Sequence, residues 1–470
     1  MKTTRFITTI IFLTLLVGCR TVGPNYSRPA IKAPEGFRGA PDTTVAASAS
    51  LADQKWFDVF KDEQLQDLIR TALEQNYDLR DALVRVEAAR AGLGLARADQ
   101  LPAIGVSTDV TTSRTSRTGS FPLPAGFDQQ RTTGSLGVNL LSFEADVWGR
   151  LKRSTEAARA KVLASEEDRK TVVTILISDV AGAYFNLLEL DSELAIAKRT
   201  LATREDSLKL IRSREHKGLS TRLDVRQGEQ LVQAAQQAIP NIEQLIEQTE
   251  NQISLLLGNN PGSIARGRSL TEQEQPVSVP PGLPSDLLER RPDIRSAEQT
   301  LIASNAMIGV AKAAYFPRIT LTGLLGTQSG QLTNLFTGAT GIWQFIPQLT
   351  QPIFTAGRLR SNVDLVTAEQ QLVLIRYEKA IQTAFREVSD TLIQYEKVRE
   401  IRTKQEELLT TLQDRSRLSY IRYRGGVDTL LNALDADRDL FNAELGLAQS
   451  RRNELLTLVQ LYRVLGGGWQ

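Results

Sequence analysis

The stretch from Arg358 to Arg424 contains neither glycine nor proline, and glycines follow it at Gly425–Gly426. Its apolar residues recur with alternating steps of four and three, as a coiled-coil seam requires, for example at Ile381, Phe385, Val388, Leu392 and Tyr395. At ~1.5 Å per residue such a helix spans roughly 100 Å, several times the mean helix of globular proteins. The stretch Arg150 to Lys217 has no proline and a single glycine. Two helices of this length predict a tube or a stalk.

The N-terminus has the pattern of a secretory signal followed by a lipid-attachment site. A basic start precedes the apolar run 6–17, which is too short to span a membrane as a helix. The residues Leu-Val-Gly before Cys19 resemble a bacterial lipobox, and Cys19 is the only cysteine in the chain. We expect a signal peptide at 1–18 and a covalent lipid on Cys19, rather than an ordinary signal with a chance cysteine. Because Arg20 and not aspartate follows, lipoprotein sorting rules imply the outer membrane.

Composition excludes several classes of function. The chain has 56 Lys and Arg residues and 54 Asp and Glu residues. It therefore lacks the excess of positive charge that is typical of proteins that bind nucleic acid. The chain has one histidine, His216, at a predicted helix end, and we expect it to be exposed. We find no metal-ligand spacing, phosphate loop or G-x-S-x-G elbow, so we expect no enzyme, no metal site and no cofactor besides the lipid. Beyond the signal we expect no apolar run long enough for a transmembrane helix.

Internal repetition shows that the chain contains two copies of one unit. Residues 149–152, Gly-Arg-Leu-Lys, are echoed by residues 357–360, Gly-Arg-Leu-Arg, and each copy opens a long stretch poor in glycine and proline. The pattern of each unit predicts a helix, a strand pair, a very long helix, a glycine turn and a returning helix.

This pattern predicts the following segments. A lipidated extended arm is expected at 19–55 and a linker between the repeats at 259–284. The first repeat is expected at 56–258, with strands about 103–143 and a helical hairpin at 150–257, and the second repeat at 285–470, with strands about 318–352 and a hairpin at 358–466.

The strands have one apolar and one polar face. Residues 104–111, 135–140 and 319–322 alternate apolar with small or polar side chains, a period of two. The fourth strand, 342–349, alternates less cleanly, and the pattern does not assign its faces. Strands cross a bilayer only as a closed barrel, and four strands are too few, since the smallest such barrels have roughly eight. If these strands span a membrane, several copies of the chain contribute to one barrel, and a symmetric ring also packs the helical seams.

Motifs along the whole chain resemble those of the TolC-like outer-membrane factors, in the NodT-type efflux lipoprotein branch. Each motif is weak alone, but their order is specific. The motifs are Val22-Gly23-Pro24-Asn25-Tyr26 with Arg28-Pro29, Trp56 with Asp62, Leu65 and Leu68, Ala72-Leu73, Asn76, Asp78-Leu79, Arg291-Pro292-Asp293-Ile294, Gly357-Arg358-Leu359, Gly425-Gly426-Val427-Asp428 and Leu465-Gly466-Gly467-Gly468-Trp469.

This resemblance implies a mainly α fold with a small β part. It implies a homotrimer with a twelve-stranded transmembrane β-barrel, four strands from each protomer, above a trimeric α-helical tunnel in the periplasm. The family implies the outer-membrane channel of a tripartite efflux system, of the kind linked to antibiotic resistance. Such a channel is a passive exit duct for small molecules, which a periplasmic adaptor protein and an inner-membrane transporter, usually of the resistance-nodulation-division class, hand over.

The resemblance also implies site residues at the periplasmic helical tip. Leu431 would form an apolar constriction, and Asp435 and Arg438 would form charged rings or inter-helix pairs that hold the tip closed. The glycine turns at Gly218 and at Gly425–Gly426 are the expected docking points for the adaptor. By spacing alone, Asp435 and Arg438 form an ordinary surface pair. Asp437 stands where many family members have glutamine, which predicts an extra acid near the aperture.

Three alternatives remain beside the efflux channel. A lipid-anchored periplasmic coiled coil, such as an adaptor or spacer, would have a single hairpin and no duplicated strand–helix unit. An enzyme held at the outer membrane would need a nucleophile with its base, and the long helices leave little chain for a catalytic domain. A type I protein-secretion outlet shares the fold, but the lipobox and residues 22–26 favour the interpretation as an efflux channel.

Overall fold

The structure, a computed structural model, describes residues 21–31, 34, 36–39, 50–118, 124, 126, 128–273, 282 and 284–469. The predicted signal peptide and Cys19 lie outside the described residues. The chain divides into two compact units. Unit 1 comprises Met1–Ala30, Val86–Ser165 and Ala297–Tyr377, and unit 2 comprises Ile31–Arg85, Glu166–Ser296 and Glu378–Gln470.

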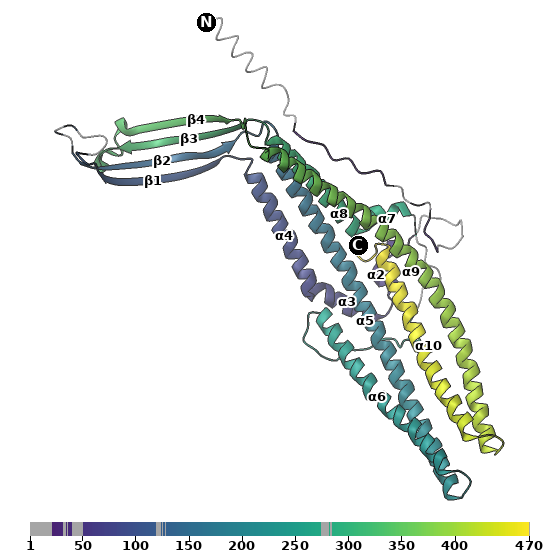
Figure 1. Ribbon diagram of the computed structural model, residues 1–470. Helices are drawn as coiled ribbons and strands as arrows, with labels where there is room; N and C mark the ends of the chain where they lie inside the picture. Colours follow the sequence, from purple (N-terminus) through teal and green to yellow (C-terminus); the bar gives the residue numbers. More distant parts are fainter. Residues whose placement is uncertain are drawn as a thin grey trace. The chain divides into compact units, whose positions relative to one another are not determined.

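Helices make up most of the described chain (Figure 1). The stretch that lacks glycine and proline is one continuous helix, α9, as predicted. The helices are α2 (Trp56–Val59), α3 (Glu63–Gln75), α4 (Tyr77–Ala98), α5 (Arg150–His216), α6 (Arg222–Leu256), α7 (Pro284–Arg290), α8 (Pro292–Ala313), α9 (Arg358–Arg424) and α10 (Leu430–Val464), with short 3-10 turns η1 (Leu51–Asp53), η2 (Leu332–Asn334) and η3 (Gly338–Thr340).

The elements repeat with matching lengths. Helices α5 and α9 each have 67 residues. The returning helices α6 and α10 each have 35 residues. The helices that precede the strand pairs, α4 and α8, each have 22 residues. Each strand pair therefore lies between equivalent helices, which is the order of elements that the sequence repeats indicate.

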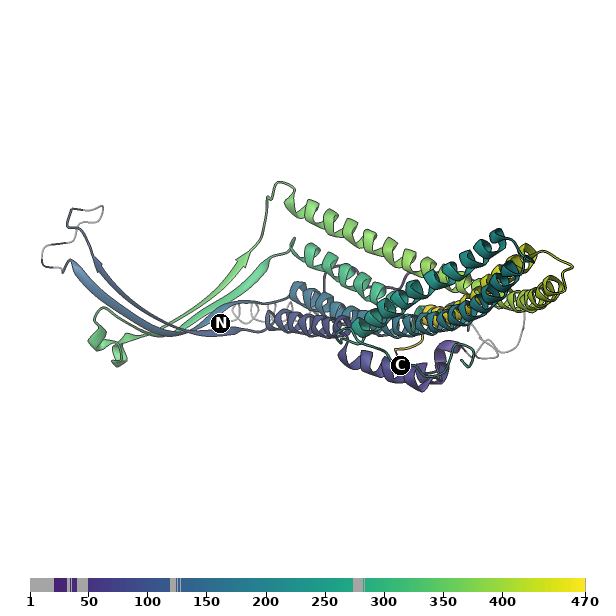
Figure 2. The same ribbon diagram turned by 90° about the horizontal axis from the view of Figure 1, so that it is seen from below.

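Four antiparallel strands form one sheet in unit 1 with the order β1-β2-β3-β4 (Figures 1 and 2). They are β1 (Ala103–Arg114), β2 (Gln130–Glu144), β3 (Arg318–Ser329) and β4 (Gly341–Thr350). The central pairing, β2 with β3, joins the two sequence repeats and contains an irregularity between Leu140 and Phe143. Strands β1 and β4 are the edges of this sheet, so each has one side without a strand partner among the described residues.

The register gives the sheet one apolar and one polar face. One transverse row contains Val106, Val138, Leu325 and Trp343, each directly opposite the next. Directly opposed residues of an antiparallel pair lie on the same face. Trp343 is 78% exposed and Val106 is 74% exposed. The rows on the other face include Asp109, Ser135 and Gln328.

This register assigns the faces of β4, which the sequence pattern leaves open. Phe345 lies opposite Gly323, and Gly323 lies opposite Leu140, so Phe345 belongs to the apolar face with Trp343. Gln344 pairs with Leu324 and belongs to the polar face. In both views no helix of unit 1 covers either face of the sheet.

Helix α5 corrects one expectation from the sequence. It contains an 18-residue segment with a mean hydropathy of 1.6, which is long and apolar enough to cross a membrane by length and composition. In the structure 61% of this segment is buried. Tyr184 and Leu187 are fully enclosed in unit 2. A buried core helix meets the same two criteria, so the apolar character of this segment reflects packing within unit 2.

Residues 21–30 of the N-terminal arm contain no helix or strand and contact α5 and α8 within unit 1. A Cβ on Gly23 would lie 2.5 Å from the Cα of Gly309, so only glycine allows this approach. The guanidinium of Arg153, with a side chain only 4% exposed, donates to the Asn25 side chain at 2.7 Å. The Val-Gly-Pro-Asn-Tyr motif therefore has a packing role, which its sequence alone does not reveal.

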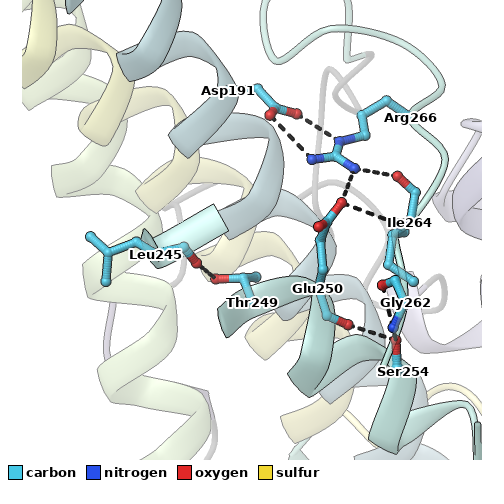
Figure 3. A network of polar contacts seen from close by, with 8 residues as sticks. All are labelled: Asp191, Leu245, Thr249, Glu250, Ser254, Gly262, Ile264 and Arg266. Carbon is cyan, nitrogen blue, oxygen red and sulfur yellow. Dashed lines mark hydrogen bonds and ion pairs between the residues drawn. The ribbon is translucent and has the colours of Figure 1, made fainter. Parts of the chain in front are cut away.

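The segment that follows α6 is fastened to the helices of unit 2 (Figure 3). Arg266 donates to Asp191 of α5 at 2.9 Å. The same guanidinium pairs with Glu250 of α6, which also accepts the amide of Ile264 at 3.2 Å. Residues 259–273, predicted as part of a plain linker, are thus a strap across α5 and α6.

The buried carboxylate of Asp62 connects the same strap to α3 and α5. Its side chain accepts five hydrogen bonds in unit 2, and the residue is 2% exposed. The donors are the amides of Gln64 (2.9 Å) and Leu65 (3.2 Å) at the start of α3, the Tyr184 hydroxyl (3.2 Å), the Arg268 amide (2.9 Å) and the Gln273 side chain (2.8 Å).

Candidate functional site: the closed ends of the two helical hairpins

The first hairpin, α5–α6, turns at Gly218. The amide of Leu219 donates to the carbonyl of Arg214 at 2.8 Å, which closes the end of α5. This kind of closure places a residue in the left-handed conformation, and Gly218 has φ +71°. Thr221 and Asp224 then start α6 with a reciprocal capping box. The turn is therefore specified by its own residues.

The second hairpin, α9–α10, turns in the same way at Gly426. The amide of Val427 donates to the carbonyl of Arg422 at 3.1 Å. Gly426 has φ +74°, whereas Gly425 does not have a positive φ. A Cβ on Gly425 would lie 3.4 Å from the carbonyl oxygen of Ile421 and 3.5 Å from that of Arg422, which is ordinary van der Waals contact. Of the two predicted glycines, Gly426 is the one whose conformation requires glycine.

Asp428 organises the start of α10. Its carboxylate accepts hydrogen bonds from the Asn432 side chain at 2.7 Å and from the Thr429 amide at 2.8 Å. The Arg422 guanidinium donates to it at 3.0 Å. The Asn432 hydrogen bond, followed by the Arg422 one, holds the pKa of Asp428 below its usual range. Asp428 is therefore a charged cap that ties the end of α9 to the start of α10.

One hydrophobic cluster joins the ends of both hairpins. Tyr423 of α9 belongs to this cluster and contacts the first hairpin. Its hydroxyl lies 3.2 Å from the Ser220 hydroxyl, and the Arg214 guanidinium lies 4.8 Å from the centre of its ring. Cation–aromatic contacts of this kind are attractive. The two turns therefore belong to one packed end. The cluster contains Ile211, Tyr423, Leu430, Ala433 and Leu434, with the half-buried Val225, Leu231 and Tyr420 against it.

The three predicted gate residues lie on the first turns of α10. Leu431 is exposed. Arg438 pairs with Asp435 at 3.1 Å and with Asp439 at 3.4 Å. Asp439 also pairs with Arg415 of α9 at 2.6 Å, and the Arg415 hydrogen bond is the main cause of its lowered pKa. Within one chain, Asp435 and Arg438 form an exposed pair on a single helix.

The structure corrects the interpretation of Asp437. This residue is 6% exposed. Its carboxylate pairs with the Nε of Arg204 at 2.8 Å. Arg204 also donates to the carbonyl of Leu231 at 3.1 Å and lies 5.0 Å from the centre of the Phe441 ring. Asp437 therefore links α10 to α5 and α6 in the interior, instead of adding an exposed acid near the aperture.

Sequence reasoning missed both Arg204 and Tyr423. Arg204 is 233 residues away from its partner, and a lone arginine in a charged helix has no signature. Its burial follows from tertiary packing, which no local pattern encodes. His216 is exposed at the last position of α5, as predicted. Within the described part of the chain, no group of three or more His, Cys, Asp or Glu side chains is placed to hold a metal ion.

Comparison with known proteins identifies the family. The family model described as "Outer membrane efflux protein" matches residues 68–259 and 283–467. The chain is 38% identical over 460 residues to the "Probable efflux pump outer membrane protein TtgC" of Pseudomonas putida, covering 97% of this chain and 94% of that protein. It is 35% identical over 457 residues to the "Cation efflux system protein CusC" of Escherichia coli, covering 97% of each.

A solved structure has the same fold. The open state of the Neisseria gonorrhoeae MtrE outer membrane channel superposes with a TM-score of 0.86 at 32% identity. The superposition covers 96% of this chain and 99% of that one. The resemblance seen in the sequence motifs is thereby confirmed over nearly the whole length. This chain belongs to the outer membrane efflux protein family, whose members are channels of the outer membrane with a periplasmic extension.

Proposed function

We propose that three copies of this chain form one channel. Each would contribute four strands to a twelve-stranded barrel in the outer membrane and two helical hairpins to a periplasmic tunnel. The channel would be the passive exit duct of a tripartite efflux pump and would perform no covalent chemistry. Relatives named for an efflux pump and for cation efflux match with similar identity, which fits a duct whose lining does not select the cargo.

The observation that carries this proposal is the two-faced sheet. Its apolar row at Val106, Val138, Leu325 and Trp343 is exposed in the single chain, and no other strand of the described residues pairs with its two edges. An exposed apolar face and unpaired backbone groups at the edge strands are unfavourable in water. In a lipid bilayer the apolar face is favourable, provided that strands of neighbouring copies pair with the edge strands. The polar face, with Asp109, Ser135 and Gln328, would then line an aqueous lumen.

We further propose that Cys19 carries the covalent lipid after cleavage of a signal peptide at 1–18. Support comes from the docked arm that begins two residues later. The Val22 amide donates to the carbonyl of Trp148 at 3.0 Å, between the end of β2 and the start of α5. Two residues reach ~7 Å, so the lipid would be attached near the strand ends, at the edge of the membrane.

We propose that the chain consists of two repeats, 56–258 and 285–470, joined by residues 259–284. Each repeat would contribute one helical hairpin.

Both hairpin turns would dock on a periplasmic adaptor protein, which connects to an inner-membrane transporter of the resistance-nodulation-division class. Support comes from apolar side chains exposed at matching places in the two turns. They are Leu219 and Leu223 in the first and Val427 and Leu431 in the second. Exposed apolar side chains of this kind are suited to bind a partner's helices.

The gate would lie at the same end. Leu431 would narrow the aperture, and Asp435 and Arg438 would pair with neighbouring copies when the tip is closed. Adaptor binding would favour the open tip by binding it more tightly than the closed one. In support, both charges of the Asp435–Arg438 pair are exposed, with side chains 40% and 55% accessible, so they are available to a second copy.

Single-channel conductance in planar bilayers tests this proposal. Wild-type protein is expected to show low or flickering conductance, and the double variant Asp435→Ala with Arg438→Ala is expected to conduct steadily, because the closed tip loses its charge pairs. The matched control is Asp414→Ala with Arg417→Ala, which removes an exposed pair of the same spacing from α9 (2.7 Å). This control should conduct as the wild type does.

Two results would contradict the proposal at different levels. Equal conductance of wild type and the Asp435/Arg438 variant would keep the channel and remove the gate assignment. No conductance from folded, oligomeric protein would favour a lipid-anchored periplasmic stalk.

A further inference from the structure

An open cavity of about 450 Å³ lies in unit 1, where β2, β3 and β4 meet the starts of α5 and α9. Part of its wall is aromatic: the rings of Trp148 and Phe316 stack with their centroids 4.7 Å apart. Trp148 is held in place by a hydrogen bond from its Nε1 to the carbonyl of Pro317 at 2.8 Å. Ile319 and Pro352 also line the cavity. This part of the wall is apolar.

The rest of the wall carries an excess of positive charge. Glu144 accepts from Arg150 at 2.8 Å and pairs with Arg318 at 2.6 Å. Asp146, the other acid in the lining, accepts the backbone amide of residue 152 in the first turn of α5. Arg358 also lines the cavity, is exposed, and has no ion pair within the described chain. Two carboxylates therefore face three guanidinium groups, which leaves the lining with one net positive charge.

We propose that this cavity binds the headgroup of a membrane glycerophospholipid. The phosphate would contact Arg358 and the exposed side of Arg318, and the first part of an acyl chain would lie on Trp148 and Phe316. An arginine-rich site favours a phosphate, because guanidinium groups form charge-assisted hydrogen bonds with its oxygens. An apolar wall next to that site requires a ligand with a hydrocarbon part, which inorganic phosphate lacks.

The position of the cavity supports a lipid from the surrounding membrane, and in this respect the inference rests on the proposed function. The cavity is at the end of the strands where α5 and α9 begin, so it would be at the periplasmic surface of the bilayer. Thr21, two residues after Cys19, packs against Gly149, the neighbour of two lining residues. Aromatic side chains also prefer this interface between lipid and water.

Native mass spectrometry of the full-length protein, purified in mild detergent, tests the site. Wild-type protein is expected to retain about one phospholipid per protomer, released on collisional activation, whereas the covalent lipid on Cys19 stays with the chain. Arg358→Gln should reduce retention about tenfold, the equivalent of one lost charge-assisted contact. Ala314→Trp, at another lining position, should reduce it by filling the cavity with every arginine intact.

The matched control is Arg360→Gln, two residues along the same helix. Arg360 is 86% exposed, is not in the lining, and pairs weakly with Asp364 at 3.9 Å. This variant should retain phospholipid as the wild type does. Conductance is measured on the same samples, so that a lost site and a lost channel are told apart.

Each outcome decides the inference. Loss of phospholipid in Arg358→Gln and Ala314→Trp, with retention in Arg360→Gln, supports it. Equal retention in all variants overturns it, because the lipid then binds elsewhere. A conducting wild type that retains no phospholipid also overturns it and means that something else, such as a neighbouring copy, covers the cavity. The expected pattern in protein that does not conduct keeps the site and contradicts the channel.

Discussion

Asp437→Ala is expected to lower the free energy of unfolding by about 3 to 5 kcal/mol, because it leaves the buried guanidinium of Arg204 without its carboxylate. Both side chains are almost fully enclosed, at 4% and 8% exposed, so water cannot replace the lost partner. The Phe441 ring and the carbonyl of Leu231 remain beside Arg204, but neither carries a negative charge. The measurement is the midpoint of guanidinium unfolding, followed by circular dichroism.

The neighbouring acid on the same helix provides the control. Asp435→Ala removes an exposed pair and should change stability by no more than about 0.5 kcal/mol. Combining Asp437→Leu with Arg204→Met replaces the ion pair by apolar side chains and should recover much of the lost stability. Equal effects of Asp437→Ala and Asp435→Ala would show that the pair is not buried in the assembled protein.

Asp62→Ala is expected to destabilise the chain by about 3 kcal/mol or more. The change removes the cap of α3, worth about 1 kcal/mol, and leaves buried donors of Tyr184 and of the strap without an acceptor, at about 1 to 3 kcal/mol for each. Asp62→Asn should restore little, because an amide group offers one acceptor oxygen where the carboxylate offers two. Thermal unfolding monitored by circular dichroism measures both variants.

Protease cleavage provides a second readout for Asp62. The strap, residues 259–273, should become more readily cleaved in Asp62→Ala because two of its hydrogen bonds are lost. The matched control is Asp67→Ala on α3, where the carboxylate is 62% exposed and pairs with the nearby Arg70. An Asp62→Ala variant as stable and as resistant as Asp67→Ala would contradict the role of this carboxylate as a connection.

Much of the fold follows from local rules that operate in the sequence. The bounds of α9 were predictable because glycines flank a long run with no helix-breaking residue and a continuous apolar seam. The strands β1 to β3 follow from their period of two. The turns at Gly218 and Gly426 follow from glycine next to basic residues at the ends of long helices.

Other features depend on contacts between distant segments, and these were not predictable. The faces of β4 became clear only from its register with β3, because Pro347 and Ile346 interrupt the alternation. The pairing of Asp437 with Arg204 needed the packing of α10 against α5. The sequences of the strap and of the docked arm are typical of loops. Their fixed conformations come from hydrogen bonds to other elements rather than from any periodicity of their own.

The most direct test of the central claim is the accessibility of single cysteines on the two faces of the sheet in intact outer membranes. Adjacent pairs are Val106→Cys with Ser107→Cys on β1 and Val138→Cys with Asn139→Cys on β2. Cys19 is the only natural cysteine and would be acylated, so the background should be low. In a lipid-embedded barrel, a membrane-impermeant maleimide should label Cys at 107 and 139 and leave 106 and 138 unlabelled. Equal labelling within both pairs would mean that water reaches both faces, and it would contradict a membrane-spanning sheet.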